Sequence, residues 1–145
     1  MATAMSAFNH TAQKLLSGDW NDGDTWKVAL YTNNTGVDLT ETTKAQVDAT
    51  ATEVANGNGY TTGGGTLANF LASTVTTNDA KLDADDFTWN ASGGSIAAAY
   101  ALIYDDTTAS DEVAFWLDLD GTQTASDGTP FIVRFNSAGI ATLTV

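Results

Sequence analysis

The amino-acid sequence predicts an all-β fold, an antiparallel β-sandwich with one short N-terminal helix. Short runs rich in β-branched and aromatic residues recur at roughly ten-residue spacing, which is typical of sandwiches and barrels. Clusters of Gly, Asn, Asp and Ser separate these runs. Helical periodicity is clear only near the N-terminus. A jelly roll and an immunoglobulin-like sandwich both fit this pattern, and 1–145 is expected to form a single domain.

The N-terminal segment 1–18 is expected to be helical over residues 2–17. Apolar side chains recur there at the spacing of one helix face, and Gly18 is expected to end the helix because glycine readily adopts the left-handed conformation. The apolar positions are Met5, Phe8, Ala12, Leu15 and Leu16. The acidic stretch 19–24 then predicts a turn.

About eight or nine short strands are expected after this turn. The run 26–31 is rich in strand-forming residues. The run 113–119 is the most apolar and is expected to be central. The other expected strands are 60–67 with an interruption at Gly63–Gly65, 75–77, 80–82, 87–90, 97–104, 131–135 and 140–145.

Two β-hairpins are predicted from turn chemistry. The first joins the strand ending at Trp89 and Asn90 to strand 97–104 across Gly93-Gly94, because a Gly-Gly pair suits the tight turns of hairpins. The second joins 131–135 to 140–145 across 136–139. The stretch 32–43 is polar and is expected to form turns. The stretch 44–55 has room for a helical turn or two, but it is expected to form a long, partly irregular connection, because the threonines around it disfavour helices.

The three consecutive glycines 63–65 are unusual inside a strand. They predict a bulge, a sheet edge or the close approach of another backbone, since a glycine has no side chain to obstruct a neighbour.

The composition excludes several classes of function. The chain of 145 residues has 5 basic and 18 acidic side chains, and its formal net charge is −13. Binding to nucleic acid or to an anionic membrane is disfavoured, because both need Lys and Arg to meet phosphates. The absence of cysteine excludes thiolate catalysis and zinc–cysteine sites. The longest apolar run, 96–104, is too short to span a bilayer.

Few residues suggest chemistry. His10 is the only histidine, and no orienting partner for a general base is evident near it, so a packing or surface role is expected. Three acidic clusters, at 19–24, 83–86 and 118–121, offer oxygen ligands of the kind that calcium prefers. None matches the twelve-residue calcium loop, and carboxylates also stabilise turns, which is the favoured interpretation. A carboxylate pair for glycoside cleavage is the weakest alternative.

The aromatic residues leave a second hypothesis open. Aromatic side chains on one face of a sandwich can stack on sugar rings, which would make the protein a carbohydrate-binding module. Core packing is favoured for Trp26, Trp89 and Trp116, because each lies in or at the end of an apolar strand. Trp20, in an acidic turn, is expected to be the most exposed of the four.

Several stretches between residue 26 and the C-terminus combine strand and turn residues in a characteristic way. They are 26–31 (WKVALY), 53–54 (EV) with 59–67 (GYTTGGGTL), 85–96 (DDFTWNASGGSI), 100–105 (YALIYD), 127–129 (DGT) and 136–140 (NSAGI). In these stretches the chain resembles a group of small structural proteins of tailed bacteriophages. The resemblance lies in the pattern of strands and turns and includes no catalytic signature.

The resemblance implies a virion protein, a cement (decoration) protein on the outer face of the capsid. The expected partner is the major capsid protein, and the expected state is a homo-oligomer, with a trimer favoured. The chain would be made in the host cytoplasm, would need no cofactor and would not be an enzyme. A tail or head-fibre role stays open. The residues expected at interfaces are Met5, Phe8, Leu15, Leu16, Gly63, Gly64 and Gly65.

Overall fold

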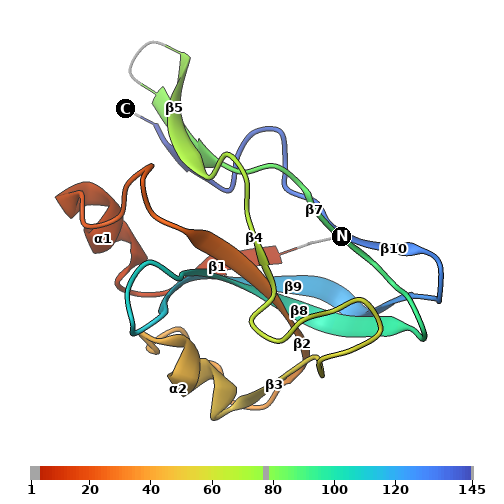
Figure 1. Cartoon of the computed structure of the whole chain (residues 1–145). Helices are drawn as coiled ribbons and strands as arrows, with labels where there is room; N and C mark the ends of the chain where they lie inside the picture. The colour runs from red at the N-terminus through yellow and green to blue at the C-terminus, as the bar shows by residue number, and fades with distance from the viewer. Residues whose placement is uncertain (1–3, 77–78, 145) are drawn as a thin grey trace.

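The protein is mostly β, which confirms the predicted all-β fold. The structure, a computed structural model, describes residues 4–76 and 79–144 (Figure 1). This part of the chain contains eleven strands and two short helices. They are β1 (Ala4–Ala7), α1 (Thr11–Ser17), β2 (Trp26–Asn34), α2 (Lys44–Asp48), β3 (Ala51–Glu53), β4 (Gly65–Thr66), β5 (Leu71–Thr76), β6 (Asp79–Asp83), β7 (Phe87–Asn90), β8 (Ile96–Asp105), β9 (Glu112–Ala125), β10 (Pro130–Val133) and β11 (Ala141–Leu143).

The strands form one large sheet and two small ones, and all their pairings are antiparallel. The large sheet has the order β1-β9-β8-β2-β3, and β4 pairs with β2 beside β3. The small sheets are β10-β7 and β11-β6-β5. The strands of the described chain thus divide into sheets of six, two and three, whereas a jelly roll has eight strands in two sheets.

Both faces of the large sheet are buried, and consecutive residues of β2 show this most clearly. Val28 and Leu30 belong to a core shared with the two small sheets. Ala29 and Tyr31 point to the opposite face, where Val47 of α2 packs against them. Side chains alternate between the two faces of a strand, so β2 contributes to two cores. In Figure 1, α2 lies below the large sheet, and β5 belongs to a hairpin that projects above it.

Two predicted strands occupy the interior of the large sheet. The run 26–31 begins β2, as expected, and β2 lies between β8 and β3. The run 113–119 lies within β9, which is flanked by β1 and β8 and is therefore not an edge strand. Nearly every residue of β8 is buried as well. A strand covered on both faces needs such a continuous apolar run.

The N-terminal helix is shorter than the periodicity predicts. Residues Ala4–Ala7 form β1, in which Met5 lies opposite Leu117 of β9, and only Thr11–Ser17 are helical. Gly18 ends the helix with φ of 76°, as expected. The helix prediction was wrong over the described residues before Thr11, because pairing with β9 satisfies the backbone groups of this segment and outweighs a weak local helical preference.

Both predicted hairpins were wrong, although the strands themselves are present. β7 pairs with β10, and Trp89 lies opposite Phe131, while β8 pairs with β2 and β9. β11 pairs with β6, so that Ala141 lies opposite Leu82. A glycine-rich turn allows a chain reversal, but it does not decide which strand becomes the hydrogen-bonding partner.

Two further expectations need correction. The stretch 44–55, predicted to be a partly irregular connection, contains helix α2 and strand β3. The side-chain oxygen of Gln46 accepts hydrogen bonds from the backbone N–H groups of Thr42 at 2.7 Å and Thr43 at 3.2 Å, which stabilises the start of this helix. Of the strand predicted over 60–67, only Gly65–Thr66 is a strand, and Tyr60 forms an isolated bridge with Gly57.

Candidate interaction surface

An apolar groove of about 390 Å³ lies between α1 and the β11-β6-β5 sheet. Leu15 and Leu16 of α1 line one wall, and Leu82 of β6 and Leu143 of β11 line the other. The register of the sheet places Leu143 opposite Ala80 on the neighbouring strand, and both line the groove. The groove therefore joins segments from opposite ends of the chain.

Large hydrophobic side chains remain exposed at the mouth of this groove. Leu16 is 80% exposed and Leu143 is 56% exposed, and they stand on opposite walls. Leu71 and Val75 of β5 are also exposed, but they do not line the groove. Exposed apolar side chains that gather around a concave surface are typical of protein-binding sites.

The floor of the groove is built from stacked aromatic rings. The ring centroids of Trp20 and Trp26 lie 5.1 Å apart in an edge-to-face arrangement. The rings of Trp26 and Phe70 stack at 4.2 Å. All three side chains line the groove and are almost fully buried. Such contacts hold the rings in fixed positions, so the groove has a stiff floor.

The prediction that Trp20 is exposed was wrong. Its side chain is 4% exposed, and its indole N–H donates a hydrogen bond to a carboxylate oxygen of Glu112 at 3.1 Å. The same carboxylate accepts a hydrogen bond from Lys14 at 3.0 Å. A partner 92 residues away in the sequence thus holds this ring inside.

The residues expected at interfaces do not share one location. Leu15 and Leu16 lie together in the groove wall. Met5, on edge strand β1, packs partly against the larger core. Phe8 is 1% exposed and belongs to the core on the α2 side of the sheet, so its side chain is occupied within its own chain. The triple glycine lies elsewhere, beside β2.

The triple glycine shows the predicted close approach, and the neighbour is the same chain. Gly64 has φ of 76°, and a Cβ atom there would overlap the carbonyl group of Val28. A Cβ atom at Gly65 would overlap the ring of Phe87. These glycines therefore allow β4 and the preceding turn to lie against β2 and β7.

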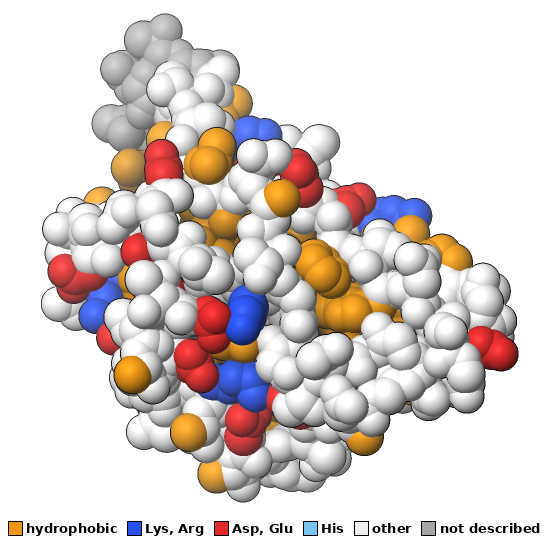
Figure 2. Space-filling view, in the orientation of Figure 1, with side chains coloured by type: hydrophobic (Ala, Val, Ile, Leu, Met, Phe, Trp, Pro, Cys, Tyr) orange, Lys and Arg blue, Asp and Glu red, His pale blue; other side chains and the backbone are white. Residues whose placement is uncertain are grey.

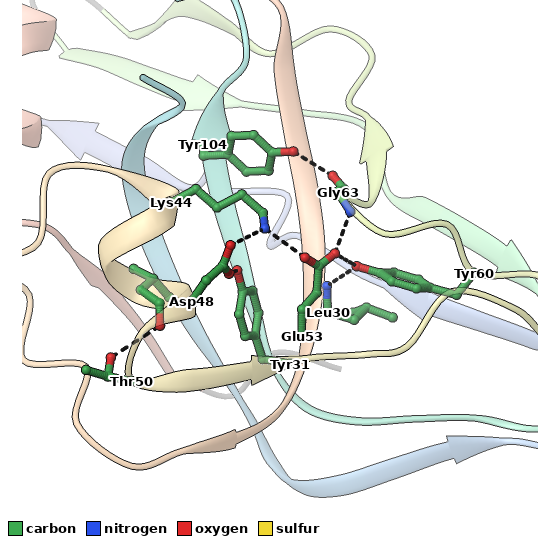
Figure 3. Close-up of polar contacts among 10 residues, drawn as sticks. Leu30, Tyr31, Lys44, Asp48, Thr50, Glu53, Tyr60, Gly63 and Tyr104 are labelled. Atoms are coloured by element: carbon green, nitrogen blue, oxygen red, sulfur yellow. Dashed lines mark hydrogen bonds and ion pairs between the residues drawn. The ribbon is translucent and has the colours of Figure 1, made fainter. Parts of the chain in front are cut away.

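A polar network under this turn was not foreseen from the sequence (Figure 3). The ammonium group of Lys44 lies 2.8 Å from Asp48 and 2.7 Å from Glu53. The second carboxylate oxygen of Glu53 accepts hydrogen bonds from the Tyr60 hydroxyl at 2.6 Å and from the Gly63 N–H at 2.5 Å. Lys44 is 7% exposed, so this charge is almost fully removed from water.

Tyrosine hydroxyls complete the network. Tyr31 donates to Asp48 at 2.5 Å, and Tyr104 donates to the carbonyl of Gly63 at 2.6 Å. The Tyr60 oxygen also accepts a hydrogen bond from the backbone N–H of Leu30. Every carboxylate oxygen of Asp48 and Glu53 has a partner within the chain. The network therefore joins α2, β3 and the turn before β4 to the large sheet, which is a structural role. The spacing of Lys44 and Asp48 on one helix face is the only signal of it in the sequence.

This network predicts a loss of stability in alkali. Burial, assisted by nearby carboxylates, raises the pKa of Tyr31, Tyr60 and Tyr104 above the ordinary value of about 10. Burial alone would lower the pKa of Lys44, but its hydrogen bonds to Asp48 and Glu53 raise it overall. The folded state thus keeps protons that the unfolded chain loses, so unfolding becomes easier as the pH rises above about 10.

We expect the urea midpoint of unfolding to fall steeply above about pH 10, with most of the tyrosinate absorbance appearing together with the loss of structure. Titration of all tyrosines near pH 10 in a protein that keeps its native circular dichroism would contradict this expectation.

The acidic clusters serve turns and ion pairs in the structure. Asp24 accepts a hydrogen bond from the N–H of Asn21, Asp118 from that of Asp120, and Asp86 from that of Phe135. Within residues 4–76 and 79–144, no group of three or more His, Asp or Glu side chains is arranged to hold a metal ion. The turn-forming interpretation is the one that these contacts support.

The three other tryptophans pack inside the protein, and the half-buried His10 packs against the ring of Trp20. Trp26, Trp89 and Trp116 are between 2% and 6% exposed, as the packing interpretation predicts. Their ring faces are therefore unavailable for stacking on a sugar. His10 contacts the ring of Trp20 edge-to-face at 5.6 Å, and burial lowers its pKa.

The fold and the groove define an all-β protein of the sandwich-like class with a candidate protein-docking surface. No family model, curated protein or solved structure matches the chain. None of the helices in the described part of the chain is long and apolar enough to cross a membrane.

Proposed function

We propose that the protein is a structural component of a tailed-bacteriophage virion, a cement (decoration) protein that binds between major capsid subunits on the outer face of the head. The observation that carries this proposal is the apolar groove with Leu16 and Leu143 exposed on its two walls. A protein that acts by adhesion needs such a surface on a stiff scaffold. The resemblance to small structural proteins of tailed phages supplies the kind of partner.

The arrangement of charges supports a binding role of this kind. Each of the five Lys and Arg side chains forms an ion pair with a carboxylate of the same chain. Figure 2 shows Lys and Arg side chains lying against Asp and Glu on the visible face. The remaining surface is strongly acidic, so the proposed function involves no nucleic acid and no anionic membrane. Adhesion of this kind also requires no enzymatic activity.

Uptake by capsid shells tests the proposal directly. Shells are assembled from the major capsid protein encoded in the same genome, without this protein, and are then mixed with the purified chain. We expect saturable co-sedimentation and a higher temperature of shell disruption, because many weak contacts repeated over a lattice hold firmly together. An unrelated acidic protein of similar size is the control. Absence of uptake at a large molar excess would overturn the proposal.

A tail or head-fibre component is the alternative that the same features allow. Gold labelling of the protein in purified particles, viewed by electron microscopy, separates the two locations. Label over the head surface supports the cement role, and label confined to the tail supports the alternative. Sedimentation equilibrium of the free protein tests the proposed homo-oligomer, for which a trimer is favoured.

A further inference from the structure

We infer that the groove between α1 and the β11-β6-β5 sheet binds a segment of another protein that carries apolar side chains flanked by basic residues. The inference rests on the proposed function, since the capsid shell would supply this segment. Beyond the proposed function, the inference specifies which site on the chain binds the partner and what chemistry the partner segment has. It also excludes a second copy of this chain as the occupant of the groove.

The shape and lining of the groove require apolar side chains in the partner. Its floor is the aromatic surface of Trp26 and Phe70, and its upper walls end in Leu16 and Leu143. Covering these two leucines would remove from water apolar surface that the free protein leaves exposed. A polar segment would lose its hydrogen bonds to water without finding partners in the groove.

One carboxylate lines the groove on the α1 side, and two more lie in the same turn. Asp22 is exposed and lines the groove. Asp19 and Asp24 lie in the same turn, and Asp19 already lies 3.7 Å from Lys14. Lys14 is also paired with Glu112, so its charge is balanced within the chain.

The opposite rim carries one cation among the described lining residues, and it is also balanced. Lys81 lines the groove, but its ammonium group lies 2.7 Å from Asp83 and donates a hydrogen bond to the carbonyl of Ser137. The mouth of the groove is therefore acidic overall and would attract Lys or Arg on either side of an apolar segment.

The same charges disfavour a second copy of this chain as the occupant. A second copy seated in the groove would bring a chain of net charge −13 against the acidic rim. This repulsion concerns the groove alone, and the copies of the proposed homo-oligomer would contact one another through another surface. Every Lys and Arg of the chain lies within ion-pair distance of a carboxylate in the described structure, so a second copy would bring no unpaired cation to the groove rim. Like charges that face one another across an interface suppress association. A partner of opposite or neutral charge fits the rim, and a copy of this chain does not.

Three substitutions test the site in the full-length protein, with the capsid shells as the probe. Leu16→Asp and Leu143→Asp place a charge on each wall, and both positions are exposed enough for the variants to fold. Val75→Asp is the matched control, since Val75 is 52% exposed on the same small sheet but does not line the groove. Circular dichroism and thermal unfolding verify that all three variants fold.

We expect each groove variant to lose shell affinity by about tenfold or more, because a charge must be desolvated to enter an apolar contact. The Val75→Asp variant should bind as the wild type does. Wild-type binding should weaken as salt is raised, because salt screens attraction between an acidic rim and a basic partner. Asp22→Lys should weaken binding at low salt more than the control Glu41→Lys, which changes a carboxylate outside the groove lining.

The outcomes distinguish a failure of the groove assignment from a failure of the proposed function. If the wild type is not taken up by the shells, the proposed function fails. If the wild type is taken up and both groove variants bind equally well, the function stands and the groove assignment is overturned. Self-association that strengthens with salt and is lost in Leu143→Asp would show that a second copy occupies the groove, which also overturns the assignment.

Discussion

Replacement of Gly64 by alanine is expected to lower the free energy of unfolding by more than about 3 kcal/mol, a large effect for the addition of one methyl group. Gly64 has φ of 76°, which an alanine adopts only at a cost, and its new methyl group would overlap the Val28 carbonyl of β2. Because a backbone atom cannot rotate away, the turn before β4 would have to move off the large sheet.

Gly93→Ala is the matched control for this effect. Gly93 has φ of 82°, but a Cβ atom there would meet no other atom within 4 Å. The conformational cost alone should lower the free energy of unfolding by about 1 to 2 kcal/mol. Urea denaturation of the two variants measures the difference. Equal losses would show that the close approach of the turn to β2 does not matter for stability.

Replacement of Lys44 by methionine is expected to lower the free energy of unfolding by about 3 to 5 kcal/mol, because it leaves the Glu53 carboxylate buried without its cation. The side chains of Lys44 and Glu53 are 9% and 10% exposed. The carboxylate would keep its hydrogen bonds from Tyr60 and Gly63 but would have lost its only ion pair in the described structure.

Lys27→Met is the control, since Lys27 and Asp106 form an ion pair with side chains 27% and 30% exposed. A pair so accessible to water should contribute at most about 1 kcal/mol. Adding Glu53→Gln to the Lys44→Met variant should restore part of the loss, because the unpaired charge is then removed. Equal effects at Lys44 and Lys27 would contradict a buried, structural network.

Much of the fold follows from local patterns. The run 26–31 is rich in aromatic and branched side chains and forms the first part of β2, and the apolar run 113–119 lies inside β9. The αL conformation of Gly18 follows from the absence of a side chain. These features depend on residues that are close in sequence, so the sequence can predict them without knowledge of the tertiary contacts.

Pairings between strands could not be predicted in the same way. The turn at Gly93 suggested that β7 and β8 pair with each other, but Trp89 lies opposite Phe131 and Leu102 lies opposite Trp116. Several apolar strands of similar length compete for each partner. The choice depends on which arrangement buries both faces, and that is a property of the whole chain.

The residues of the candidate groove could likewise be predicted from the sequence only in part. Helical spacing indicates Leu15 and Leu16 as one apolar face, and both line the groove. No local pattern indicates Leu143, because turn chemistry favours pairing of the last strand with 131–135, whereas that strand lies beside β6. The alternation of Ala141 and Leu143 is the available signal, but three residues are too few to show which face is exposed.

By itself, the sequence determined that the chain would form short antiparallel strands and where several of them lie, and it determined the acidic charge of the surface. Tertiary structure alone decided that Phe8 and Trp20 are buried, that Lys44 and Glu53 meet, and that α1 and β11 enclose a groove. The physical reason is the range of the forces concerned. Backbone preferences act over a few residues, whereas burial and charge pairing join segments that are brought together only when the chain folds.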